Sequence, residues 1–274
     1  MKTESPEVYE GGSGEPLVLL HGVGGSWRIW KPVIPLLERR YRVIVPNLPG
    51  HPGGAALSGA PTVAHLADTL IAQLRARGIQ DAHVAGNSLG GWLAVELARR
   101  GFARSVTALS PAGAWSSAEA FKALADNLSL RFRLMSVLYV LFWIFMIFAG
   151  VRRVLAKDTM KRGDRVPTPE FRAMLRSFRD AQVLPPLFAN TGPAGGLMPL
   201  AAGAIPIRVA WCADDLVLPY DIYGAPFVAR IAGVDRVVID SVGHVPMYDD
   251  PATVARVITE GCRVAGPAGI AADC

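Results

Sequence analysis

Short hydrophobic runs alternate with longer segments of helical periodicity along most of this chain. The runs end at turns rich in glycine, proline, serine or aspartate and predict strands at Leu17–Leu20, Arg42–Pro46, Ala82–Ala85, Ser105–Leu109, Ile205–Trp211 and Arg236–Asp240. The segments between them space apolar residues three or four apart and predict helices at Trp30–Arg40, Thr62–Arg77, from the Gly86–Gly90 turn through Arg100, near Tyr220–Ile231 and at Ala252–Arg263. This alternation is typical of an α/β fold with a mostly parallel open sheet flanked by helices.

The alternation stops after Ser110-Pro111 and resumes near Ile205. The residues between look helical at first and then become rich in proline and glycine from Leu184 to Pro199. We therefore expect one core made of residues 1–112 and 204–264. Residues 113–203 are expected to form an inserted helical lid, and residues 265–274 a disordered tail.

Composition narrows the class of protein. Of the 274 residues, 51% are hydrophobic and 19% are charged, which excludes a disordered chain. The net charge of +5 comes from scattered basic residues without a Lys/Arg run of five, so no nucleic-acid partner is expected. Cys212, Cys262 and Cys274 are too far apart for a CxxC metal or redox motif. The first residues lack the apolar stretch of a secretory signal, which favours a cytoplasmic location.

The pentapeptide Gly86-Asn87-Ser88-Leu89-Gly90 has the G-x-S-x-G pattern of a nucleophile elbow. It follows a predicted strand and precedes an apolar helix, which is the context that this motif requires. So tight a turn strains the serine backbone, and the glycines on either side leave room for it. The following helix directs its positive end and the free Leu89 N–H toward the reacting centre, which favours a developing oxyanion. We predict that Ser88 is a nucleophile.

A second glycine-rich turn, His21-Gly22-Val23-Gly24-Gly25, directly follows the run Leu17–Leu20. Such a turn lets the backbone approach a substrate closely and leaves N–H groups unpaired. The functional interpretation is that the Val23 N–H is the second oxyanion donor beside Leu89. The alternative is an ordinary turn with a structural His21.

Acidic and imidazole side chains follow two later strands. Asp214 and Asp215 come after Ile205–Trp211, and His244 comes after Arg236–Asp240. A carboxylate at a strand end can fix a histidine tautomer, and the imidazole can then take a proton from serine. Either aspartate is a candidate on these grounds. Because the carboxyl ends of parallel strands share one edge of a sheet, Ser88, an aspartate and His244 are predicted to converge there.

These motifs, in the order Ser, Asp, His, resemble the α/β-hydrolase superfamily over roughly Pro16–Pro111 and Ala204–Cys262. The family's D-x-x-x-P pattern is fitted by Asp215 and Pro219, so the resemblance selects Asp215 over Asp214 as the acid. It implies an α/β-hydrolase fold and a reaction that needs no metal or other cofactor. Relatives that open epoxides or remove halide use aspartate as nucleophile, whereas Ser88 implies acyl transfer through an acyl-enzyme.

The inserted segment contains an uncharged run of 18 residues, Leu134–Val151, flanked by Arg131, Arg133, Arg152 and Arg153. This length reaches the lower limit for a membrane span, but a single crossing would separate Ser88 from Asp215 and His244. We expect a lid helix over an apolar pocket, with a lid helix resting in a membrane interface and a true span as alternatives. The run carries an aromatic stripe, expected to contact a lipophilic substrate: Tyr139, Phe142, Trp143, Phe145 and Phe148.

The sequence thus predicts a serine hydrolase of carboxylic esters with lipophilic or aromatic acyl groups. The residues expected to contact the substrate are Gly22, Asn87, Tyr139, Phe142, Trp143 and Val217. One alternative is C–C bond hydrolysis of a vinylogous diketone, because relatives with that activity also carry asparagine before the serine. A catalytically silent ligand-binding homologue is a third possibility. Nothing in the sequence indicates an oligomeric state.

Overall fold

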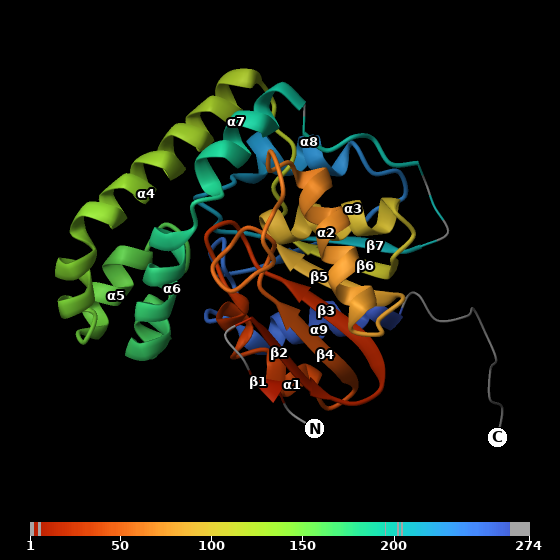
Figure 1. Ribbon diagram of the computed structural model, residues 1–274, viewed down its shortest axis with the longest axis horizontal. Coiled ribbons are helices and arrows are strands. Elements are labelled where there is room, and N and C mark those ends of the chain that lie inside the picture. Colours follow the sequence, from red (N-terminus) through yellow and green to blue (C-terminus); the bar gives the residue numbers. More distant parts are fainter. Residues whose placement is uncertain (1–2, 5–6, 195, 202, 204, 264–274) are drawn as a thin grey trace.

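An eight-stranded sheet forms the centre of the computed structural model, which describes residues 3–4, 7–194, 196–201, 203 and 205–263 (Figure 1). Its strands run in the order β1-β2-β4-β3-β5-β6-β7-β8. They are β1 (Thr3–Glu4), β2 (Val8–Gly12), β3 (Glu15–Leu20), β4 (Tyr41–Pro46), β5 (Ala82–Asn87), β6 (Ala103–Leu109), β7 (Ile207–Cys212) and β8 (Asp235–Ile239). Strands β3 to β8 pair in parallel, whereas β1 and β2 pair antiparallel. The mostly parallel sheet is confirmed.

Side chains of the central strands alternate between two hydrophobic cores, one on each face of the sheet. Val18 and Leu20 of β3 pack with α2 (Val63–Ala76) and α3 (Leu89–Arg99) on one face. Leu17 and Leu19 pack on the other face with the 3-10 turn η1 (Trp27–Trp30), α1 (Ile34–Leu37) and α9 (Pro251–Arg263). Burial on both faces explains why these strands are continuous apolar runs.

Three local expectations differ from the structure. The segment Trp30–Arg40 is not one helix, because Pro32 and Pro35 interrupt it, and it forms η1 and α1 instead. Tyr220–Ile231 forms a π-helical turn, η3 (Tyr220–Gly224), followed by the short α8 (Ala225–Val228). The sequence does not predict β1 and β2, because VYEGG has few apolar residues and two glycines.

Between β6 and β7 the chain forms a layer of helices that extends away from the sheet (Figure 1). These are α4 (Ala118–Phe145), α5 (Ala149–Ala156), the 3-10 turn η2 (Gly163–Arg165), α6 (Thr168–Asp180) and α7 (Leu184–Ala194). The first turn of α7 contains Pro185 and Pro186, where proline is tolerated because these N–H groups have no helical partner. Among the described helices, α4 alone is long and apolar enough to cross a membrane. The predicted tail, residues 265–274, lies outside the described residues.

Candidate active site

Ser88 stands at the turn between β5 and α3 with φ 57° and ψ −120°, a conformation that is rare for a residue other than glycine. The turn is possible because its flanking residues are glycines. A Cβ at Gly86 would clash with the backbone of Gly90, and a Cβ at Gly90 would clash with the Leu20 carbonyl. The strand-to-helix elbow expected from the motif is therefore present, and it places Ser88 at the carboxyl edge of the sheet.

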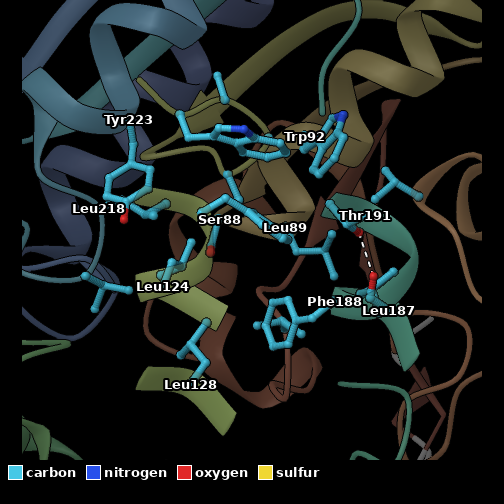
Figure 2. A pocket seen from close by; sticks show the side chains of 18 residues that line it. Ser88, Leu89, Trp92, Leu124, Leu128, Leu187, Phe188, Thr191, Leu218 and Tyr223 are labelled. Atoms are coloured by element: carbon cyan, nitrogen blue, oxygen red, sulfur yellow. Dashed lines mark hydrogen bonds between the residues drawn. The ribbon is translucent and has the colours of Figure 1, made fainter. Parts of the chain in front are cut away.

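The Ser88 side chain points into an apolar pocket (Figure 2). The core contributes Val23, Leu89, Trp92, Val217 and Leu218 to its wall, and the inserted helices contribute Phe121, Leu124 and Leu128 from α4 and Leu187, Phe188 and Thr191 from α7. Thr191 donates its hydroxyl hydrogen to the Leu187 backbone oxygen, so this donor is already engaged. A ligand at Ser88 would be surrounded mainly by hydrocarbon.

His244 and Asp215 form a buried pair beside this pocket. The Nδ1 atom of His244 lies 2.7 Å from Oδ2 of Asp215. The other carboxylate oxygen accepts hydrogen bonds from the backbone N–H groups of Val217 at 2.9 Å and Leu218 at 2.7 Å. With both oxygens engaged, the carboxylate is fixed in place and can orient the imidazole through its Nδ1 atom.

The two neighbouring aspartates point to different partners. Asp214 is half-exposed and pairs with the ammonium group of Lys161 on the inserted segment. Asp215 is buried against His244, in agreement with its position in the D-x-x-x-P pattern. The geometry thus distinguishes two residues that strand position alone leaves equivalent.

Asn87 links the turn of Ser88 to the loop of His244. Its side-chain amide donates hydrogen bonds to the backbone oxygens of His244 at 2.9 Å and Leu109 at 3.1 Å. Asn87 is buried and is not part of the pocket wall, which corrects the expectation that it contacts the substrate. The Ser88 hydroxyl makes no hydrogen bond within the described residues, and a serine–imidazole contact commonly tightens only when substrate binds.

The glycine-rich turn after β3 lies directly against Ser88. A Cβ added to Gly22 would lie 3.1 Å from Cβ of Ser88 and 3.7 Å from its hydroxyl oxygen. Within the described residues, the N–H groups of Val23 and Leu89 are not donated to any protein acceptor. Both residues line the pocket beside Ser88, so two free donors adjoin this serine.

Two buried histidines hold this turn. His51 Nε2 accepts a hydrogen bond from the Gly24 N–H at 3.0 Å, and His21 Nε2 accepts one from the Leu48 N–H at 2.9 Å. Each acceptor nitrogen must be unprotonated. Burial lowers the pKa of His21 to about 3, with a further contribution from His51, and burial lowers the pKa of His51 to about 4. His21 is thus structural, and the sequence did not predict the role of His51.

The inserted segment contacts the site through two further interactions that the sequence did not predict. Asp249, five residues after His244, accepts backbone hydrogen bonds from Gly243, Lys161 and Arg162. Ser177 of α6 donates its hydroxyl to the Gly25 oxygen at 2.6 Å, next to the Val23 turn. The insertion therefore supports the two loops that flank Ser88. The sequence feature that could have indicated the Asp249 contacts is the acidic pair Asp249-Asp250 before Pro251.

The aromatic stripe predicted from the sequence lies outside the pocket at Ser88. Tyr139, Phe142 and Trp143 belong to the second half of α4, whereas the pocket wall uses residues from its first half. Arg179 stacks on Tyr139 and Arg172 on Trp143, each with its guanidinium carbon 3.9 Å from the ring centroid. These residues do not line the pocket, which corrects the expectation that they contact the substrate there. A helix rises about 1.5 Å per residue, so α4 is too long for both of its halves to reach Ser88.

Comparisons with known proteins agree with this fold. A profile of the alpha/beta hydrolase family matches residues 17–257. The chain is 32% identical over 197 residues to epoxide hydrolase EphH of Mycobacterium tuberculosis, covering 71% of this chain and 92% of that one. Its structure is similar to a thermophilic esterase from Thermogutta terrifontis, with TM-score 0.69, 19% identity, and coverage of 97% and 99%. It also resembles an enol-lactonase from Burkholderia xenovorans, with TM-score 0.68, 19% identity, and coverage of 93% and 95%.

Proposed function

The chain belongs to the alpha/beta hydrolase family, and from that premise we propose that it is a serine hydrolase of carboxylic esters with lipophilic or aromatic acyl groups. The observation that carries the proposal is the arrangement of Ser88 at a strained elbow, at the mouth of an apolar pocket, next to the buried His244–Asp215 pair. The proposal is supported by the positions of Ser88, Asp215 and His244, which follow β5, β7 and β8 at the carboxyl ends of parallel strands.

In the proposed reaction, the Ser88 oxygen adds to the ester carbonyl carbon while His244 Nε2 takes the hydroxyl proton. Asp215 keeps the Nδ1–H of the imidazole in place and stabilises its charged form. The Val23 and Leu89 N–H groups hold the oxyanion. When the tetrahedral intermediate collapses, the alcohol leaves with the proton from His244, and an acyl-enzyme remains on Ser88.

A water molecule then completes the cycle. His244 removes its proton, the hydroxide adds to the acyl carbon, and the second tetrahedral intermediate releases the acid and returns the proton to Ser88. The apolar wall contributed by α4 and α7 surrounds the acyl group, and burial of hydrocarbon there favours lipophilic acyl chains by about 0.8 kcal/mol per methylene. In this reaction the inserted helices act as the lid of the pocket.

The nature of the nucleophile distinguishes this proposal from the activity named for the mycobacterial relative. Epoxide opening in this fold uses a carboxylate nucleophile, and this chain has Ser88 at that position. C–C bond hydrolysis was suggested by Asn87, but the Asn87 amide is engaged by two backbone oxygens, which gives this residue a structural reason to be present. Ester cleavage is therefore the reaction that these residues support best.

The test is a substrate panel with purified protein and its Ser88→Ala variant. p-Nitrophenyl esters of graded acyl length, a vinylogous diketone and a styrene-type epoxide are assayed together with fluorophosphonate labelling. We expect ester turnover and covalent labelling, both lost in Ser88→Ala. Turnover of the diketone or the epoxide without ester cleavage would replace the proposal, and a folded protein with neither labelling nor turnover would indicate a silent ligand-binding homologue.

A further inference from the structure

The solvent-exposed side of α4 changes from mainly polar to mainly apolar residues about halfway along the helix. In its first half the exposed residues include Lys122, Asp126 and Asn127, and Lys122 pairs with Asp126 at 2.6 Å. In its second half most of the exposed residues are apolar, and six of them form what we call the apolar face: Leu134, Val137, Val140, Leu141, Ile144 and Phe145. Val137 is 79% exposed and Val140 is 68% exposed. A helix on a water-facing surface carries polar residues outward, and α4 follows that rule only as far as Asn127, since Leu130 is 57% exposed.

The apolar face continues beyond the end of the helix. Ile147 and Phe148, in the turn between α4 and α5, are 57% and 55% exposed, and Val154 of α5 is 64% exposed. Single exposed apolar side chains are ordinary, but a contiguous run of large ones marks a surface that contacts something other than water. None of these residues lines the pocket at Ser88, so substrate binding does not explain them.

The segment that carries this face has charged residues of only one sign. Residues 131–157 contain five basic residues and no acidic residue. Arg131 pairs with Asp158, and Arg152 is buried against backbone oxygens, so both have structural roles. Arg133, Arg153 and Lys157 are exposed and form no ion pair with any described residue. The apolar face is therefore bordered by free cations.

We propose that this face binds peripherally to a lipid bilayer that contains anionic lipid, with the apolar side chains in the interface and the cations against the head groups. This pattern of an apolar side and a basic border is that of a helix that lies in the plane of a membrane. A second copy of the chain fits less well, since two-fold packing of these faces would bring like charges together. The binding surface is separate from Ser88 and does not depend on the proposed chemistry.

A membrane crossing by α4 is incompatible with the contacts of the insertion. The segments before and after it are β6 and β7, which pair side by side, and α4 packs back against α6 and α7. Helix α6 in turn contacts the core through Ser177 and Gly25. Both ends of α4 are thus held on the same side as the sheet, which leaves only the interface for its apolar face.

The experiment is sedimentation of the purified full chain with vesicles, either pure phosphatidylcholine or phosphatidylcholine with phosphatidylglycerol. The variants are Val137→Asp/Val140→Asp on the apolar face and Arg133→Gln/Arg153→Gln/Lys157→Gln at its border. Ala123→Asp, exposed on the polar half of the same helix, is the matched control. Melting temperature and circular dichroism verify that each variant folds, and Ser88→Ala is included so that binding is measured without catalysis.

We expect binding to the anionic vesicles that falls roughly tenfold or more in either multiple variant and is unchanged in Ala123→Asp and Ser88→Ala. Binding should also weaken as salt is raised. Equal binding to both vesicle types, binding that survives Val137→Asp/Val140→Asp, or the absence of binding would overturn the proposal. A dimer in sedimentation velocity that these aspartates dissociate, with no vesicle binding, would assign the face to a second copy. Loss of ester turnover alone would bear only on the proposed function.

Discussion

The side-chain amide of Asn87 donates a 2.9 Å hydrogen bond to the backbone oxygen of His244, across 157 residues of sequence. The residue before Ser88 therefore holds the loop that carries His244. A second bond from the same amide, to the Leu109 oxygen at 3.1 Å, connects this pair to β6. The loop of His244 is thus tied to the turn of Ser88 by a buried residue that is not part of the pocket wall.

Replacing this amide should impair turnover more than substrate binding. We expect Asn87→Ala to lower kcat for a p-nitrophenyl ester by roughly tenfold or more with a smaller change in KM, because the loop of His244 loses its anchor. Two buried carbonyls lose their donor, so stability should fall by about 1–3 kcal/mol in urea unfolding. Asn127→Ala, an exposed position on α4, should change neither quantity. An unaffected kcat in Asn87→Ala would contradict the positioning role.

The two adjacent aspartates should respond differently to the same substitution. Asp215→Asn keeps the shape of the side chain but removes the charge that stabilises the imidazolium, and a loss of about 10⁴ in kcat is expected. Asp214→Asn breaks only an exposed pair with Lys161 and should leave kcat within about twofold. Steady-state kinetics on both variants decides the assignment. The reverse order of effects would make Asp214 the acid.

Acyl-chain preference should be controlled by the first half of α4. Leu124→Trp fills the pocket beside Ser88, so kcat/KM for long-chain esters should fall about tenfold or more while the acetate ester is affected much less. Phe142→Ala lies outside the pocket and should leave the ratio of long-chain to short-chain kcat/KM unchanged. A chain-length profile that shifts in Phe142→Ala but not in Leu124→Trp would restore the original expectation for the aromatic stripe.

Stability should depend on pH through the buried histidines. His51 has its ordinary pKa near 6.5 in the unfolded chain and about 4 in the folded protein, so between these values the unfolded state binds more protons. The contribution of this residue to stability is complete above pH 6.5 and is lost as pH falls toward 4, by roughly 1.4 kcal/mol per pH unit at most. His51→Gln retains an acceptor for the Gly24 N–H and does not titrate.

Urea unfolding between pH 7.5 and pH 4.5 tests this dependence. The stability of wild type should fall more steeply than that of His51→Gln over this range, and His65→Gln, at a partly exposed position on α2, should follow wild type. Parallel curves for wild type and His51→Gln would show that protonation of His51 is not linked to folding.

Arg152 should stabilise the inserted helices. Its guanidinium donates hydrogen bonds to the backbone oxygens of Met146 at 2.6 Å and Ile147 at 3.1 Å, at the carboxyl end of α4, where a cation is favoured. We expect Arg152→Met to cost about 2–4 kcal/mol in local opening, seen as faster amide exchange in α4 and α5 with the sheet unchanged. Arg153→Met, at an exposed neighbouring position, is the control. Unchanged amide exchange in Arg152→Met would show that Arg152 does not stabilise these helices.

Much of the core and of the candidate site was predictable because it depends on local constraints. Strands buried on both faces must be apolar runs, a strand-to-helix elbow needs glycines around Ser88, and parallel strands bring their carboxyl ends to one edge. The spacing of Asp215 and Pro219 fits a family pattern, and the structure places that carboxylate against His244. These constraints act on neighbours in sequence or on the topology of a sheet.

The tertiary structure alone decided features that depend on which surfaces meet. Sequence periodicity could not show that Leu124 and Leu128 of α4 line the pocket while Val137 and Val140 are exposed to solvent. An apolar residue produces the same sequence pattern whether it lines a pocket or lies on the surface. Nor could it show that His51 supports the Gly24 turn, since a hydrogen bond between loops far apart in sequence leaves no local pattern. Burial and contact partners arise only once distant segments pack, and they divide this one helix into a pocket wall and an exposed face.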